Sequence, residues 1–197
     1  MKKISQIIFV LLAAVMLAGC AGGNGVAEQG DSVQIAKDGS VTGTLVDVLD
    51  QSYYNSDELK TMIETEVAEA NTTLGTEAVT LDDYECDSAG NVKVKVKYAD
   101  SNAYTAFNGG TFYCGDAVTA KDTYGLKGNF LDVKDGKITT DDAVVSEDTK
   151  VVVLSENVNI IVPGKIVAIT DNVEIIGKKS ASVSLKSEEE LAYIVYK

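Results

Sequence analysis

The amino-acid sequence predicts an α+β fold, with about four antiparallel strands, one long helix and one short helix in the first part and a β-rich second part. Three observations lead to this fold class. A helix between Asn55 and Gly75 carries a start and a stop signal, valines alternate with lysines from Val92 to Tyr98, and a strand-turn-strand pattern recurs at a spacing of fifteen residues after residue 150.

The long helix follows a strand-like run at residues 40–49. Asn55 is placed to be its N-cap, and Glu58 is the acidic residue at the third helical position that completes a capping box. Gly75 supplies the left-handed residue that ends the helix. The apolar residues between recur at helical spacing and form one face, which we expect to pack on a sheet: Leu59, Met62, Ile63, Val67 and Ala70.

The flat partner of this helix is a hairpin with one buried valine face and one solvated lysine face. A turn at residues 87–91 places Glu85 opposite Lys93. The same register places Asp83 opposite Lys95, and such pairs favour it by roughly 0.2–1 kcal/mol each. The lysines have two interpretations, a solvated sheet face or a contact for an anionic envelope polymer.

A short helix and a strand complete this part. Asp100 can cap the helix, Gly109 and Gly110 end it, and residues 111–118 form the strand. The order is then strand, helix, strand, strand, short helix, strand. One topology with this order is the ferredoxin-like split β-α-β arrangement.

The second part contains the internal repeat. Residues 151–162 align with residues 166–177 at a spacing of fifteen, and a fainter copy precedes them at residues 140–145. Asn157 and Asn172 each end a short loop where a left-handed residue is favoured, which predicts hairpins. Hairpins in series predict a meander, a small sandwich or a partly closed barrel. A β-solenoid of parallel strands is the alternative for a repeat of this length.

The first twenty residues carry an export signal. Lys2 and Lys3 form a basic start, and a mostly apolar run follows that ends in the sequence Leu17-Ala18-Gly19-Cys20. The run is shorter than the roughly 20 apolar residues of a membrane-spanning helix, which predicts a signal peptide.

These last four residues resemble the lipobox of bacterial lipoproteins. The resemblance implies cleavage between Gly19 and Cys20, and attachment of diacylglycerol and an acyl chain such as palmitate at Cys20. Two or three such chains hold a protein durably at a bilayer. The implied location is extracytoplasmic on the cell membrane, or on the outer membrane in a cell that has one, because Ala21 permits that sorting. An ordinary secretory signal with a chance cysteine is the alternative.

Four segments follow from these observations. They are a lipoprotein signal peptide at residues 1–19, the lipidated cysteine with a Gly-rich flexible tether at 20–36, an α+β domain at 37–122 and a β-rich repeat domain at 123–197.

The composition excludes several classes of function. The net charge is −13, and it becomes −15 when residues 1–19 and their two lysines are removed, so the chain repels nucleic acid. All 17 basic residues are lysines and histidine is absent, which leaves no Ser-His-Asp triad, no histidine-ligated zinc and no arginine clamp. The sequence therefore assigns no catalytic residue, no metal site and no cofactor.

Cys86 and Cys114 are the thiols that remain beside the lipidated Cys20, and both lie on predicted strands. Export permits a disulfide between them, which would stabilise the fold by roughly 3–4 kcal/mol in the chain-entropy account. A ferredoxin-like order places their strands at opposite edges of a sheet, so two buried free thiols are the alternative. The pair lacks the CxxC spacing of a redox site.

Together these observations predict a non-enzymatic surface lipoprotein, held at the lipid bilayer through Cys20, that binds an envelope or extracellular partner through an exposed aromatic or apolar patch. The layout and the closing residues 192–196 are similar to small lipoproteins of anaerobic gut bacteria, a resemblance that implies no site residues. Two alternatives stay open. An assembly protein acting by strand addition predicts an open apolar edge within residues 151–176, and a carboxylate-dependent envelope hydrolase predicts two converging acids with a raised pKa.

Overall fold

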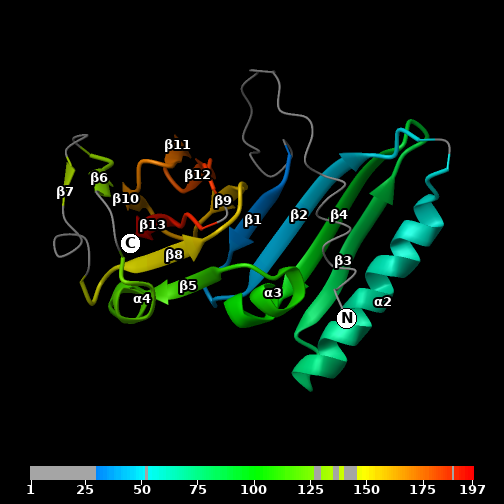
Figure 1. Ribbon diagram of the computed structural model, residues 1–197, viewed down its shortest axis with the longest axis horizontal. Coiled ribbons are helices and arrows are strands. Elements are labelled where there is room, and N and C mark those ends of the chain that lie inside the picture. The colour runs from blue at the N-terminus through cyan, green and yellow to red at the C-terminus, as the bar shows by residue number, and fades with distance from the viewer. Residues whose placement is uncertain (1–29, 52, 127–129, 135–137, 140–145, 188) are drawn as a thin grey trace.

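The computed structural model describes residues 30–51, 53–126, 130–134, 138–139, 146–187 and 189–197. Within these residues the chain forms two β-sheets and three helices, which confirms the predicted α+β class (Figure 1). The predicted signal peptide, Cys20, the first part of the tether and the faint repeat copy at 140–145 lie outside the described residues.

The larger sheet has seven strands in the order β11-β12-β9-β1-β2-β4-β3. Neighbours are antiparallel except β1 and β9, which are parallel. Its strands are β1 (Ser32–Ile35), β2 (Val41–Val48), β3 (Val79–Cys86), β4 (Asn91–Tyr98), β9 (Asn159–Ile161), β11 (Val173–Gly177) and β12 (Ser180–Val183).

The smaller sheet has six strands in the order β5-β8-β13-β10-β6-β7, all antiparallel. Its strands are β5 (Phe112–Asp116), β6 (Phe130–Asp132), β7 (Ile138–Thr139), β8 (Lys150–Leu154), β10 (Ile166–Ile169) and β13 (Ala192–Tyr196).

Helix α2 (Ser56–Leu74) begins and ends where the sequence predicts. The Asn55 side chain accepts the N–H groups of Asp57 and Glu58 at 2.9 and 3.2 Å. Gly75 ends the helix with φ of 69°. The helix packs against β3, and its apolar face meets the core through Leu59, Ile63, Val67, Ala70 and Leu74. Met62, which was predicted on this face, is instead 43% exposed.

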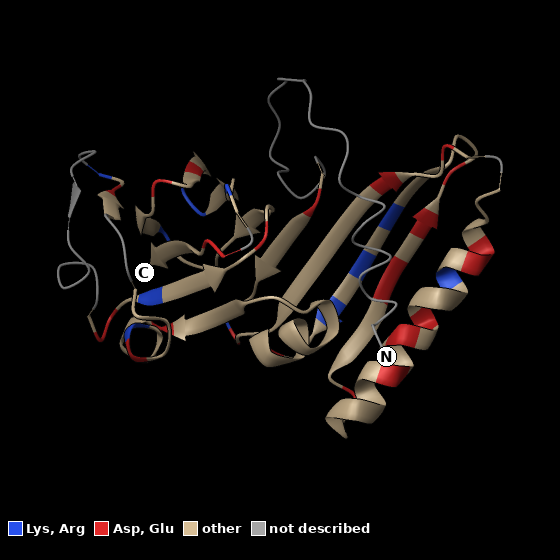
Figure 2. Cartoon of the chain, viewed as in Figure 1, with Lys and Arg blue, Asp and Glu red and all other residues tan. Residues whose placement is uncertain are grey.

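The hairpin of β3 and β4 has the predicted register. Glu85 pairs with Lys93 and Asp83 with Lys95 across the ladder. Figure 2 shows the lysines of β4 beside the acidic residues of β3. The opposite face of β4 is buried, as the alternation predicts, through Val92, Val94, Val96 and Tyr98.

Strands β2, β4 and β3 with α2 form a split β-α-β unit, as predicted. Both β2 and β3 are antiparallel to β4, which lies between them, so they are parallel to each other. The full ferredoxin-like topology is not formed, because β5 pairs with β8 in the smaller sheet. Strand β1 takes the place beside β2 instead.

The two repeat copies contain strands at the predicted places, but the predicted hairpins between them are absent. β8 and β10 belong to the smaller sheet, and β9 and β11 belong to the larger one. β13 lies between β8 and β10, and β12 lies between β9 and β11, so the described residues form neither a simple meander nor a solenoid. The reason is burial. Val151 to Leu154 are 0% exposed, and a strand that is buried on both faces needs a central place in a sheet that is covered on both faces.

The predicted boundary between residues 122 and 123 does not separate the two sheets. β5, from before it, joins the smaller sheet, and β9, β11 and β12, from after it, join the larger one. Ile35, Tyr104 and Ile194 belong to one buried cluster between the sheets and helices. A second cluster lies between α4 (Ala117–Tyr124) and the other face of the smaller sheet. The division into two domains stays a prediction.

Two described elements differ from the prediction. β1 lies within the predicted tether, because Val33 and Ile35 alternate with polar residues and are only 2% and 3% exposed. Helix α4 begins inside the strand predicted at 111–118. Asp116 caps it by accepting a backbone N–H at 2.7 Å, and Gly125 ends it with φ of 74°.

Candidate functional site

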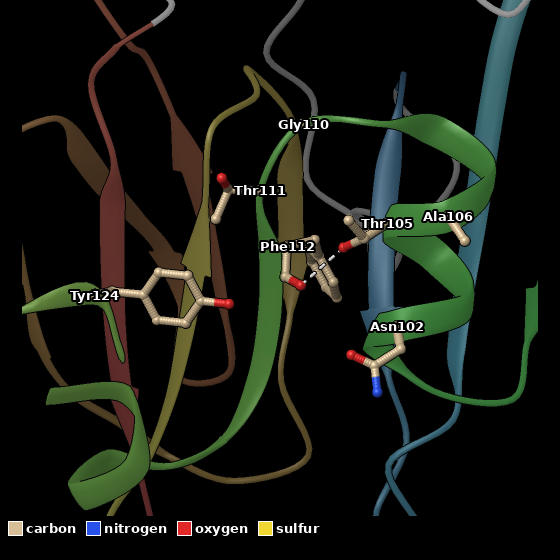
Figure 3. A pocket seen from close by; sticks show the side chains of 7 residues that line it. All are labelled: Asn102, Thr105, Ala106, Gly110, Thr111, Phe112 and Tyr124. Atoms are coloured by element: carbon tan, nitrogen blue, oxygen red, sulfur yellow. Dashed lines mark hydrogen bonds between the residues drawn. The ribbon is translucent and has the colours of Figure 1, made fainter. Parts of the chain in front are cut away.

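A groove crosses β5 between α3 (Ser101–Asn108) and α4, with a volume of about 290 Å³. Figure 3 shows α3 on one side of β5 and the ring of Tyr124 on the other. We call this feature the β5 groove. Its lining residues are Asn102, Thr105, Ala106, Gly110, Thr111, Phe112 and Tyr124.

The β5 groove forms because one helix ends and another begins on either side of a short strand. The Asp100 side chain accepts a backbone N–H at 2.8 Å at the start of α3. Gly109 and Gly110, with φ of 80° and 68°, then turn the chain into β5. Residues that carry a side chain rarely adopt positive φ values, so this turn depends on glycine. The Asp116 cap redirects the chain into α4 after five residues of strand.

Contacts to the core fix the floor of the groove. The ring of Phe112 lies 4.4 Å from the ring of Tyr104, centroid to centroid. The Thr105 hydroxyl donates to the carbonyl oxygen of Phe112 at 3.0 Å, which ties α3 to the free side of β5. The N–H of Thr111 donates to Ser155 Oγ at 2.8 Å. These contacts therefore fix β5, α3 and the loop after β8 relative to one another.

Three polar side chains that line the groove have no hydrogen-bond partner within the described part of the protein: Asn102, Thr111 and Tyr124. Tyr124 is held in place by its ring, 5.5 Å from the ring of Tyr113, and by its carbonyl oxygen, which accepts the Tyr193 hydroxyl at 3.3 Å. No lining residue is a carboxylate or a lysine. The groove offers amide, hydroxyl and aromatic groups, but no charge.

A second polar cluster, half-buried, lies around the loop that joins β8 to β9. The Tyr104 hydroxyl donates to Glu156 Oε1 at 2.8 Å. Burial raises the pKa of Glu156, the Tyr104 hydrogen bond lowers it, and the charge of Asp31 raises it. Burial also raises the pKa of Asp31, whose Oδ1 accepts the N–H of Val46 at 3.0 Å. The hydrolase alternative predicts such acids, but neither carboxylate lines the β5 groove.

The two remaining cysteines are free thiols. Cys86 lies on β3, at one edge of the larger sheet, and Cys114 lies on β5, at one edge of the smaller sheet. Burial raises the pKa of Cys114, and a hydrogen bond with the neighbouring Ser101 lowers it. Both cysteines are therefore unbridged in the structure, but they are partly exposed, whereas the sequence alternative expected buried thiols.

The lysines of β4 lie beside carboxylates. Lys97 Nζ is 2.6 Å from Asp82 Oδ1, and Lys95 Nζ is 3.6 Å from Asp83 Oδ2. An anionic polymer would have to displace these acids before it could reach the lysines. The pairing favours the solvated-face interpretation.

Neither a membrane span nor a metal centre is found in the described ranges. No helix there has the length and apolar character needed to cross a bilayer. No group of three or more histidine, cysteine, aspartate or glutamate side chains there is arranged to hold a metal ion.

Comparison of the chain with protein-family models, curated proteins and solved structures gives no match. The β5 groove must therefore be interpreted from its own chemistry.

The sequence analysis did not identify the groove. It singled out three cysteines: Cys86 and Cys114 do not line the groove, and Cys20 lies outside the described residues. The signals that could have located it are the Gly109-Gly110 turn and the Asp116 cap, which bracket β5 between two helices.

Proposed function

We propose that this chain is a non-enzymatic lipoprotein, anchored outside the cytoplasmic membrane through acylated Cys20, that binds an envelope or extracellular ligand in the β5 groove. The lipobox-like sequence at residues 17–20 supports the anchor and the location. If the host has an outer membrane, Ala21 permits sorting to it.

The observation that carries the binding proposal is the set of free polar side chains in the groove. Asn102, Thr111 and Tyr124 are held by a fixed backbone, and their polar side-chain groups make no hydrogen bond to the described residues. Ligand sites typically combine apolar surface with a few placed polar groups, and the volume of about 290 Å³ is just below their roughly 300–1,000 Å³ range, so the groove suits a small ligand or part of a larger one.

The proposed anchor keeps the groove near the membrane. Residues 21–31 join Cys20 to β1, and a chain of this length spans at most about 40 Å when fully extended. A ligand bound in the groove is therefore retained within a few nanometres of the bilayer.

The two alternative functions receive less support. Of the strands within residues 151–176, β8, β9 and β10 are internal, and only β11 lies at a sheet edge. Strand addition is therefore limited to β11, a five-residue strand with Glu174 in it. For the hydrolase, Asp31 and Glu156 bind protein groups and do not line the groove.

Two experiments test the proposal. Detergent partition and mass spectrometry of the native protein should find an acylated Cys20 in the membrane fraction, and Cys20→Ala should release the protein. Residues 21–197, immobilised and exposed to envelope and extracellular fractions of the host, should retain a ligand that Tyr124→Ala loses and the matched control Tyr53→Ala keeps. Tyr53 is 74% exposed and far from the groove in sequence. Equal retention by both variants would contradict the binding site.

A further inference from the structure

We infer that the β5 groove binds an uncharged glycan, whose hydroxyl groups pair with the Asn102 amide and the Thr111 and Tyr124 hydroxyls, and whose apolar ring face lies on the groove surface. This inference rests on the proposed function of the same groove and names its ligand class.

The absence of charge in the lining argues against ionic ligands. An anionic ligand would meet no lysine among the lining residues and would approach a chain of net charge −13. A cationic ligand would find no carboxylate there. The lining thus offers no counter-charge to an ionic ligand, and its amide and hydroxyl groups suit a neutral one.

The free groups match hydroxyl chemistry. The Asn102 amide both donates and accepts, and the hydroxyls of Thr111 and Tyr124 do the same. A sugar hydroxyl also donates and accepts at one atom, so each can pair with any of these side chains. The Tyr124 ring and Ala106 add apolar surface for the C–H face of a sugar ring.

A peptide strand fits this groove less well. Strand addition needs free backbone groups along the edge of β5. On that edge the carbonyl oxygen of Phe112 already accepts the Thr105 hydroxyl at 3.0 Å, and α3 packs along the strand. The remaining polar groups come from side chains, which favours a ligand recognised by its hydroxyls.

The test is titration of residues 21–197 with neutral cello-, malto-, xylo- and manno-oligosaccharides, followed by calorimetry and by NMR shifts. We expect binding of at least one neutral series. Tyr124→Ala should weaken it about tenfold or more, and Thr111→Val, which keeps the shape and removes the hydroxyl, about fivefold. Tyr53→Ala should bind as the unchanged protein does, and far-UV circular dichroism of each variant checks that it is folded.

Several outcomes would overturn the inference. They are no neutral series binding at millimolar concentration, stronger binding of oligogalacturonate than of every neutral series, or neutral binding unchanged in folded Tyr124→Ala and Thr111→Val. If the immobilised protein still retains a host ligand through Tyr124, the glycan class fails while the proposed binding function stands. If Tyr124→Ala retains every host ligand as the unchanged protein does, both the glycan class and the proposed binding site fail.

Discussion

The hydrogen bond between Tyr104 and Glu156 allows a quantitative test of the half-buried acid cluster. Tyr104→Phe removes the hydroxyl that donates to Glu156 Oε1 and keeps the ring packing on Tyr98, at 4.9 Å between centroids. Hydrogen bonds to charged groups contribute roughly 1.5–3 kcal/mol. We therefore expect this substitution to lower the free energy of unfolding by about 2 kcal/mol at pH 7.

Glu156→Gln tests the charge separately. Glutamine keeps an oxygen that accepts the Tyr104 hydroxyl, but it cannot ionise. Because the folded-state pKa of Glu156 is raised above 4.5, its stabilising contribution is complete below that value and is lost as the pH rises through the folded-state pKa. Glutamine does not ionise, so the Glu156→Gln variant keeps this contribution as the pH rises. The variant should therefore become more stable than the unchanged protein between about pH 4 and pH 7.

Urea denaturation of residues 21–197 at pH 4 to 7, followed by circular dichroism, measures both effects. Tyr53→Phe is the matched control, because Tyr53 is 74% exposed, and this substitution should change the free energy of unfolding by less than about 0.5 kcal/mol. The account of this cluster is refuted if Tyr104→Phe matches the control, or if Glu156→Gln leaves the pH dependence unchanged.

Three further substitutions or measurements address the fold. The Asn71 side chain bonds the backbone of residues 78 and 79 at 2.8–2.9 Å, so Asn71→Ala should cost about 2–3 kcal/mol in urea denaturation, against under about 0.5 kcal/mol for the neighbouring Thr72→Ala. Ile194 is 0% exposed on β13, so Ile194→Ala should cost about 3–4 kcal/mol, and a loss below about 1 kcal/mol would place β13 outside the core. Both Cys86 and Cys114 should react with Ellman's reagent without a reductant. Cys114 should react more slowly, because burial raises its pKa. Thiols that react only after reduction would instead show a disulfide between them.

Local features were predictable from the sequence because their causes are local. The cap at Asn55 and the stop at Gly75 are decided by residues within one helical turn, and both ends of α2 lie where predicted. The register of the β3–β4 hairpin was predictable because Asp83 and Glu85 meet their lysines across a tight turn.

Sheet partners were not predictable, because they depend on segments far apart in sequence. Nothing in residues 32–35 shows that they pair with β9, and nothing near residue 112 shows that β5 leaves the first sheet. One signal was present: Val151 to Leu154 and Ala192 to Tyr196 are unbroken apolar runs, which indicate central strands covered on both faces. That signal argues against a half-exposed meander.

The β5 groove carries no sequence motif. Its unbonded polar side chains, Asn102, Thr111 and Tyr124, come from α3, the turn before β5 and α4, and are common residue types. What makes them a candidate site is their position and their lack of protein partners among the described residues, and both properties belong to the fold. The lipobox is the opposite case, because its four residues are contiguous.

Hydrogen exchange of residues 21–197, with and without the host fraction retained by the immobilised protein, tests the binding claim most directly. The account predicts added protection in residues 102–112 and around Tyr124, and no such protection in Tyr124→Ala. Protection confined to β11 or to the Asp31–Glu156 cluster would contradict it and would favour strand addition or an acid-based site instead.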